Sequence, residues 1–205
     1  TKIEKSSPFK ALEDIIKSLG KADKGPFPFN AGLQGFFSYD LKDIILAPKI
    51  KPSKKRGSLG LPLCVCGLYK AIYVYDHSLN TGHIAGLQDR SSKDSILRLK
   101  DALKNPQSHA HGTEGKKPAP ARSFGSNTPR GQYINSIKKA LKYIAEGDIY
   151  QINLSHRLKI PWKGDAFSLF ASLAGEKPSP FSSFMDFGEF QIVSNSPERF
   201  LKITE

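Results

Sequence analysis

Residues 146–160 read Glu-Gly-Asp-Ile-Tyr-Gln-Ile-Asn-Leu-Ser-His-Arg-Leu-Lys-Ile. From Tyr150 to Ile160, every second side chain is Tyr, Ile, Leu or His, and the side chains between them are Gln, Asn, Ser, Arg and Lys. This strict alternation predicts a β-strand with one face in a core and one polar face. The polar face is either a solvated sheet surface or the wall of a cleft that grips a polar, anionic ligand.

The segment before this stretch is predicted to be a helix. Thr128 is a suitable capping residue, Pro129 suits the first turn, and Gly147 suits the end of the helix. Apolar residues recur between them at steps of three and four, which is typical of one buried helical face: Ile134, Ile137, Leu141 and Ile144. This helix delivers the chain into the alternating stretch.

The same kinds of pattern predict the other elements. Helices are expected from about Pro8 to Leu19, from Ser92 to Lys104, and after a capping Asp165. Strands are expected at residues 32–41, within 61–76, and at 83–87, 181–187, 190–193 and 200–203. Residues 105–127 are rich in Gly and Pro and poor in large apolar side chains, which predicts a flexible linker between residues 1–104 and 128–205.

Composition excludes some classes of protein. The 205 residues suffice for a substantial core. The sequence contains no run of about 18 apolar residues, which argues against a membrane span. The amino terminus lacks the apolar core of a secretory signal, so a cytoplasmic protein is expected. The formal net charge of +12 favours anionic ligands.

Two smaller features have mainly structural interpretations. The basic cluster between Lys49 and Arg56 lies among Pro, Ser and Gly and lacks interleaved aromatics, so a solvated loop is favoured over a nucleic-acid-binding patch. Cys64 and Cys66 share one face of a predicted strand without an easy disulfide geometry, and free thiols are expected.

Three segments together carry a resemblance to a known family. They are Gly147-Asp-Ile-Tyr-Gln-Ile-Asn-Leu-Ser155, Lys177-Pro-Ser-Pro-Phe-Ser-Ser-Phe184 and Ser196-Pro-Glu-Arg-Phe200. In order and spacing they resemble the chorismate-utilising enzymes, specifically the component I subunits of aminodeoxychorismate synthase and anthranilate synthase. Residues 35–41 and 67–77 look like the amino-terminal half of that family.

The resemblance implies an α+β fold with mostly antiparallel sheets packed face to face and helices outside. Residues 1–104 correspond to the amino-terminal component I region, and residues 128–205 to the first part of the chorismate-binding catalytic domain. Family segments expected beyond Glu205 include a Pro-Ile-Lys-Gly-Thr segment and the glutamates that bind magnesium. We therefore expect an incomplete piece of a longer subunit, catalytically silent by itself.

Two residues bear on the branch of the family. Anthranilate synthases typically carry apolar residues where Asn153 stands, so this chain looks more like the aminodeoxychorismate branch. Family members that add water to chorismate usually have lysine where Gln151 stands, and an amide cannot serve as a general base for water. Gln151 thus favours the branches that use ammonia.

Site residues also follow from the resemblance. Glu198 is implied to be an acid or base near the ring carbon that changes substituents, although without the other motifs a residue that caps a turn after Pro197 would be favoured. Tyr150, Pro180 and Phe181 match positions that line a tryptophan pocket in relatives, although apolar packing would explain the same side chains. Gln151 and Glu198 are expected to form one wall of the chorismate pocket.

The implied function is amination of chorismate at C4 for para-aminobenzoate and folate biosynthesis. The implied cofactor is Mg²⁺, and the implied partners are a glutamine amidotransferase subunit and, as in some members of the family, bound tryptophan, with no nucleic acid and no membrane. Anthranilate synthase component I, which serves tryptophan biosynthesis, is the alternative within the family. A non-catalytic tryptophan-binding module is the alternative from another class.

Overall fold

A computed structural model describes residues 7–19, 27–46, 59–87, 89–105 and 124–203. The chain forms two compact units, residues 1–111 and 112–205. Their boundary falls inside the predicted linker, of which residues 106–123 lie outside the described residues. The basic cluster at residues 49–56 lies outside them as well.

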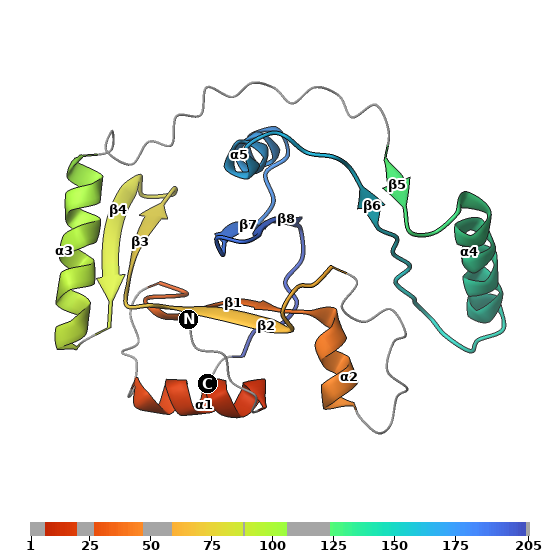
Figure 1. Ribbon diagram of the computed structural model, residues 1–205, viewed down its shortest axis with the longest axis horizontal. Helices are drawn as coiled ribbons and strands as arrows, with labels where there is room; N and C mark the ends of the chain where they lie inside the picture. The colour runs from red at the N-terminus through yellow and green to blue at the C-terminus, as the bar shows by residue number, and fades with distance from the viewer. Residues whose placement is uncertain (1–6, 20–26, 47–58, 88, 106–123, 204–205) are drawn as a thin grey trace. The chain divides into compact units, whose positions relative to one another are not determined.

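The first unit contains three helices, one 3-10 turn and four strands among its described residues (Figure 1). In chain order these are α1 (Pro8–Ser18), β1 (Gly32–Phe37), η1 (Tyr39–Leu41), α2 (Lys42–Ile45), β2 (Cys64–Tyr69), β3 (Ala71–Asp76), β4 (Thr81–Gly86) and α3 (Arg90–Lys104). Strand β1 pairs antiparallel with β2, and β3 pairs antiparallel with β4. Helix α3 packs on both strands of the second pair.

Most predictions for this unit are confirmed, and the differences have local causes. The strand expected at residues 32–41 ends at Phe37, because the Ser38 hydroxyl accepts the Asp40 N–H and starts the η1 turn. The helix expected from Ser92 begins at Arg90, because the Asp89 carboxylate accepts the backbone N–H of Ser92 at 2.7 Å. The predicted hairpin is present, and its turn is held by Asp76.

The second unit contains α4 (Arg130–Ala145), α5 (Ala166–Glu176) and two strand pairs among its described residues. The short pair joins β5 (Gly125–Ser126) to β6 (Leu158–Lys159), and the long pair joins β7 (Phe181–Asp186) to β8 (Gln191–Ser196). Helix α5 packs on the long pair, where the rings of Phe167 and Phe170 lie 5.4 and 6.0 Å from that of Phe184.

The α5 and β7–β8 predictions are confirmed, including the cap by Asp165, whose carboxylate accepts the Ser168 N–H at 2.7 Å. The predicted cap of α4 is wrong: Pro129 is the N-cap residue, and no side chain caps this helix. The strand expected at residues 200–203 is also wrong. These residues are irregular, and Phe200 is fully exposed.

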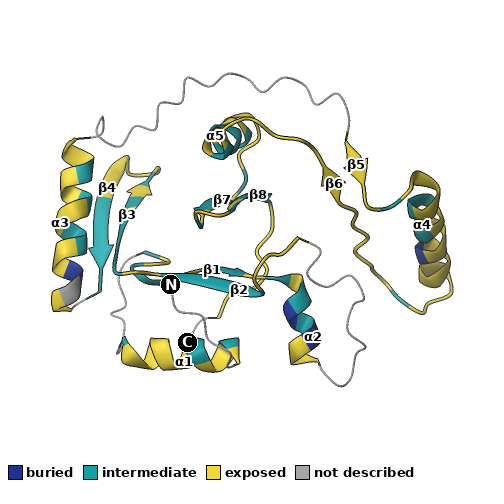
Figure 2. Ribbon diagram, in the orientation of Figure 1, coloured by how far each residue is buried: buried dark blue, intermediate teal, exposed yellow. Residues whose placement is uncertain are grey.

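The strand predicted from Tyr150 to Ile160 is mostly wrong. Within the described part of the chain, Leu158–Lys159 is the only piece of this stretch that pairs with another strand, and residues 150–160 are all exposed (Figure 2). Alternation defines two faces, but a strand also needs a hydrogen-bonding neighbour. Among the described residues, that neighbour is β5 together with Asn127, which exchanges hydrogen bonds with the Arg157 backbone at 2.8 and 3.0 Å.

All the strand pairs of the described residues are antiparallel, and helices accompany two of them. This confirms the predicted α+β class with antiparallel sheets. Within the described part of the chain, Leu41 and Ala140 are the buried apolar residues, and the other apolar side chains are half-buried or exposed. No described helix is both long enough and apolar enough to cross a membrane.

Candidate functional site

The candidate site lies at the open end of the β7–β8 hairpin. Helix α5 ends where the backbone N–H of Lys177 donates to the Leu173 carbonyl at 3.0 Å. A short segment, Lys177-Pro-Ser-Pro180, then leads into β7, and we call it the KPSP loop. The first pair of the ladder is Phe181 with Ser196, so the KPSP loop and the residues after β8 meet at one end of the hairpin.

Side-chain hydrogen bonds tie the KPSP loop to β8. The Asn195 amide donates from Nδ2 to the Lys177 carbonyl at 3.1 Å, and its Oδ1 lies 2.6 Å from the Ser182 hydroxyl. Ser182 also reaches back to the Ser179 carbonyl, with its backbone N–H at 3.1 Å and its hydroxyl at 2.9 Å. The loop is therefore fixed at its beginning and at its end.

Glu198 follows β8 in a turn that Ser196 holds. The Ser196 hydroxyl donates to the Glu198 carbonyl at 3.0 Å and accepts the Glu198 N–H at 3.4 Å. This confirms the turn that the residues suggested, and it leaves the carboxylate exposed. Among the described residues, no cation lies within salt-bridge distance of Glu198, so this carboxylate is available for proton transfer or for a polar ligand.

Phe181 is the predicted pocket residue with the most defined surroundings. The guanidinium of Arg199 lies 5.1 Å from the centre of its ring, which is within the range of a cation–π contact. Pro180 precedes it in the KPSP loop and is exposed. The hairpin end therefore brings Pro180 and Phe181 together with the segment that carries Glu198.

Among the described residues, no hydrogen bond, ion pair or ring contact joins Tyr150 or Gln151 to this end. They follow α4, whose last turn is closed by the Asp148 N–H donating to the Tyr143 carbonyl at 3.0 Å, with Gly147 at a φ of +79°. Tyr150 is 92% exposed, and Gln151 is exposed as well. The wall formed by Gln151 and Glu198, and the place of Tyr150 in a tryptophan pocket, remain predictions.

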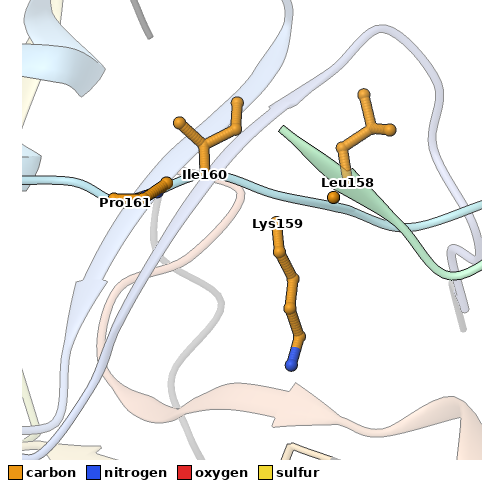
Figure 3. Close-up of a pocket in the computed structure, with 5 residues that line it drawn as sticks. Leu158, Lys159, Ile160 and Pro161 are labelled. Carbon is orange, nitrogen blue, oxygen red and sulfur yellow. The ribbon is translucent and has the colours of Figure 1, made fainter. Parts of the chain in front are cut away.

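A hollow of about 610 Å³ lies elsewhere, beside β5 and β6. It is open to solvent and is lined by Gly125 and residues 158–161 (Figure 3). Figure 3 shows the Lys159 side chain on the opposite side of the backbone from Leu158 and Ile160, so the predicted alternation is present here. None of the predicted site residues lines this hollow.

The described residues do not provide a metal centre. No group of three or more His, Cys, Asp and Glu side chains in residues 7–19, 27–46, 59–87, 89–105 and 124–203 is placed to hold an ion. The family resemblance places the magnesium ligands outside this sequence, so Mg²⁺ remains a prediction, and no chemical step here is derived through it.

The sequence-based reasoning missed the residues that organise this end of the hairpin: Ser182, Asn195, Ser196 and Arg199. A partial signal was present, because Ser and Asn side chains at strand ends commonly bond to nearby backbone groups. Their partners are not visible in the sequence, since the Asn195 bonds span 13 and 18 residues.

Comparison with known proteins assigns the family. The sequence profile of the chorismate binding enzymes matches residues 1–205, the whole length of the chain. The chain belongs to the chorismate-binding enzyme family. The resemblance inferred from the three motifs is thereby confirmed at the level of the family.

The curated relatives include anthranilate synthase and aminodeoxychorismate synthase components. Anthranilate synthase component 1 of Thermus thermophilus is 31% identical over 98% of this chain and 43% of its own length. Aminodeoxychorismate synthase component 1 of Escherichia coli is 28% identical over 93% of this chain and 40% of its own length. This chain thus spans less than half the length of these relatives.

A solved structure shows the same fold. Anthranilate synthase component I from Streptococcus pneumoniae superposes with a TM-score of 0.73, at 22% identity, over 96% of this chain and 45% of its own. This agreement confirms the fold class predicted from the family resemblance.

Proposed function

We propose that this protein is component I of aminodeoxychorismate synthase, which aminates chorismate at C4. The family match over residues 1–205 carries the proposal to a chorismate-binding enzyme. By the resemblance, Asn153 favours the aminodeoxychorismate branch, and Gln151 favours the ammonia-using branches over those that add water. Because the chain spans less than half the length of its relatives, the activity is proposed for the whole protein.

The proposed reaction exchanges one ring substituent for another. A carbon–nitrogen bond forms between ammonia and C4, the bond from C4 to the ring hydroxyl breaks, and water leaves. The hydroxyl needs a proton to depart as water, and the Glu198 carboxyl group, in its protonated form, would deliver it. Gln151 would hold a polar group of the substrate, since a neutral amide both donates and accepts hydrogen bonds.

Ammonia would come from a glutamine amidotransferase partner, and Mg²⁺ would bind through residues outside this sequence. Tyr150, Pro180 and Phe181 are proposed to line a tryptophan pocket. The half-buried Phe181 ring, with the Arg199 guanidinium 5.1 Å from its centre, places an aromatic side chain next to Pro180 at the hairpin end, which supports this assignment.

Product analysis tests the proposal. The whole protein is supplied with chorismate, magnesium and ammonium, and the products are separated by chromatography. We expect 4-amino-4-deoxychorismate, whose enolpyruvyl side chain is retained. Amination with glutamine in place of ammonium is expected only when the amidotransferase partner is present. The 205-residue chain tested alone is expected to be silent, and turnover by it would contradict that expectation.

Anthranilate synthase component I is the second candidate. It is favoured by the 31% identity to the Thermus thermophilus enzyme, against 28% for the Escherichia coli aminodeoxychorismate synthase component. The same assay separates the two, because anthranilate formation releases pyruvate and gives a fluorescent aromatic product. Anthranilate as the main product would refute our proposal in favour of this one.

The alternative of a non-catalytic tryptophan-binding module can be distinguished from the proposed enzyme by calorimetry. Such a module should bind tryptophan and show no heat with chorismate. The proposed enzyme should bind chorismate whether or not its tryptophan pocket is filled.

A further inference from the structure

We propose that Asn195 is a positioning residue that fixes the KPSP loop against β8. It thereby sets the position of Pro180 and Phe181 relative to the segment that carries Glu198. The effect of Asn195 on chorismate turnover rests on the proposed function. The structural part of the proposal rests only on hydrogen bonds among the described residues.

The orientation of the Asn195 amide follows from its partner. The Lys177 carbonyl can only accept, so the atom 3.1 Å from it is the donating Nδ2. This leaves Oδ1, which only accepts, 2.6 Å from the Ser182 hydroxyl. One side chain therefore holds both ends of the loop, with its two polar groups in their matching roles.

The Ser182 hydroxyl has one proton and two acceptors within reach, Asn195 Oδ1 at 2.6 Å and the Ser179 carbonyl at 2.9 Å. The backbone N–H of Ser182 already donates to the Ser179 carbonyl. We therefore assign the hydroxyl proton to Asn195 Oδ1, because this half-buried amide oxygen would otherwise have no donor. The loop and β8 are joined without an additional bridging group.

Asn195 and Ser196 are consecutive residues at the end of β8, and each fixes a different segment. Asn195 faces Ser182 in the ladder, and the next residue, Ser196, faces Phe181 and holds the Glu198 turn. Successive side chains of a strand point to opposite faces. Asn195 therefore fixes the loop from one face while Ser196 fixes the Glu198 turn from the other.

Hydrogen exchange tests the structural part. In Asn195→Ala, we expect the amide of Ser182 to exchange about fivefold faster, as for the loss of one hydrogen bond. Exchange in the middle of the hairpin, around Phe184 and Val193, is expected to stay unchanged. Gln191→Ala is the matched control, because it removes a side-chain hydrogen bond to Asp186 at the other end of the same hairpin.

The Asn195→Asp variant separates a positioning role from general damage. It keeps an acceptor for Ser182 but places an oxygen against the Lys177 carbonyl. At neutral pH, we expect Ser182 exchange as fast as in the Ala variant. Below about pH 4 the carboxyl gains a proton and can donate, so protection should return relative to the unmodified protein at the same pH.

Chorismate kinetics in the whole protein test the functional part. Asn195→Ala is expected to lower kcat/KM between about tenfold and a hundredfold through misplacement of the site, with Gln191→Ala close to the unmodified protein. Unchanged Ser182 exchange in Asn195→Ala, or equal losses of kcat/KM in the two variants, would overturn the proposal. If the unmodified protein does not bind chorismate, the proposed function fails, and the exchange arm still decides whether Asn195 positions the loop.

Discussion

Cys64 and Cys66 form a pair of free thiols on β2. Their sulfur atoms are 3.9 Å apart, well beyond the length of a disulfide bond. Burial raises the pKa of the Cys64 thiol to about 11, and the charge of Cys66 and the hydrogen bond to Cys66 make smaller contributions in the same direction. The thiolate is the reactive form, so Cys64 is predominantly unreactive at neutral pH.

Thiol labelling should follow this raised pKa. We expect Cys64 to react slowly with iodoacetamide at pH 8 and progressively faster towards pH 11. Cys66→Ser should speed its reaction, because removal of the neighbouring thiol lowers the pKa of Cys64. Mass spectrometry of the labelled peptides gives the rates. Labelling at pH 8 as fast as for a model thiol would contradict the prediction.

The same shift has a consequence for stability. The folded state holds the Cys64 proton more tightly than the unfolded chain, whose thiol has a pKa near 8.5 to 9. This contribution to the free energy of unfolding is fully present below about pH 8.5 and is lost as the pH rises towards 11. Chemical denaturation between about pH 8.5 and pH 11 should show a smaller decrease in the free energy of unfolding for Cys64→Ala than for the unmodified protein.

Glu198 offers a test of catalysis at a single residue. In the whole protein, Glu198→Gln should lower kcat by about a hundredfold or more, because the amide cannot deliver a proton to the leaving hydroxyl. Glu189→Gln is the control, since Glu189 is an exposed carboxylate in the turn at the opposite end of the hairpin. The activity of each variant is measured as the amount of product formed from chorismate. Equal activities of the two variants would refute the role of Glu198.

At the scale of the element, Gly35 permits the close approach of β1 to β2. A Cβ at this position would lie 1.9 Å from the Val65 carbonyl oxygen and 2.7 Å from the Cys66 Cα. Both are backbone atoms and cannot turn aside as a flexible side chain could. The two strands must therefore separate, or shift in register, to accept any side chain here.

Gly35→Ala should lower the free energy of unfolding by about 2 to 3 kcal/mol, in the range of overpacked sites. Gly131→Ala is the matched control, because a Cβ there meets nothing within 4 Å. In α4 the added methyl should be neutral or stabilising by up to about 1 kcal/mol. Thermal or denaturant unfolding measures both, and equal stabilities would show that the β1–β2 spacing is not limiting.

At the scale of the whole molecule, these 205 residues contribute a net charge of +12, which favours the approach of anionic ligands. Chorismate carries two carboxylates, so a positive field should speed its encounter with the protein. Raising the ionic strength from about 0.01 to 0.15 M shortens the screening length from about 30 to 8 Å. This change should weaken the steering.

We therefore expect kcat/KM for chorismate in the whole protein to fall as the salt concentration rises, with little change in kcat at saturation. Zwitterionic tryptophan provides a comparison, since its affinity should depend much less on salt. Stopped-flow or steady-state kinetics at several salt concentrations make the measurement. Equal salt dependence for both ligands would argue against steering.

The sequence by itself determined the class of the fold, most helices and hairpins, and the family. Local signals were sufficient there: Asp165 caps a helix by bonding to a residue three positions on, and the β7–β8 turn joins neighbouring strands. Only the tertiary structure decided that residues 150–156 have no strand partner among the described residues and that Asn195 holds the KPSP loop. Pairing and side-chain bonds over long separations depend on which segments meet in space, and alternation of residue types does not record that.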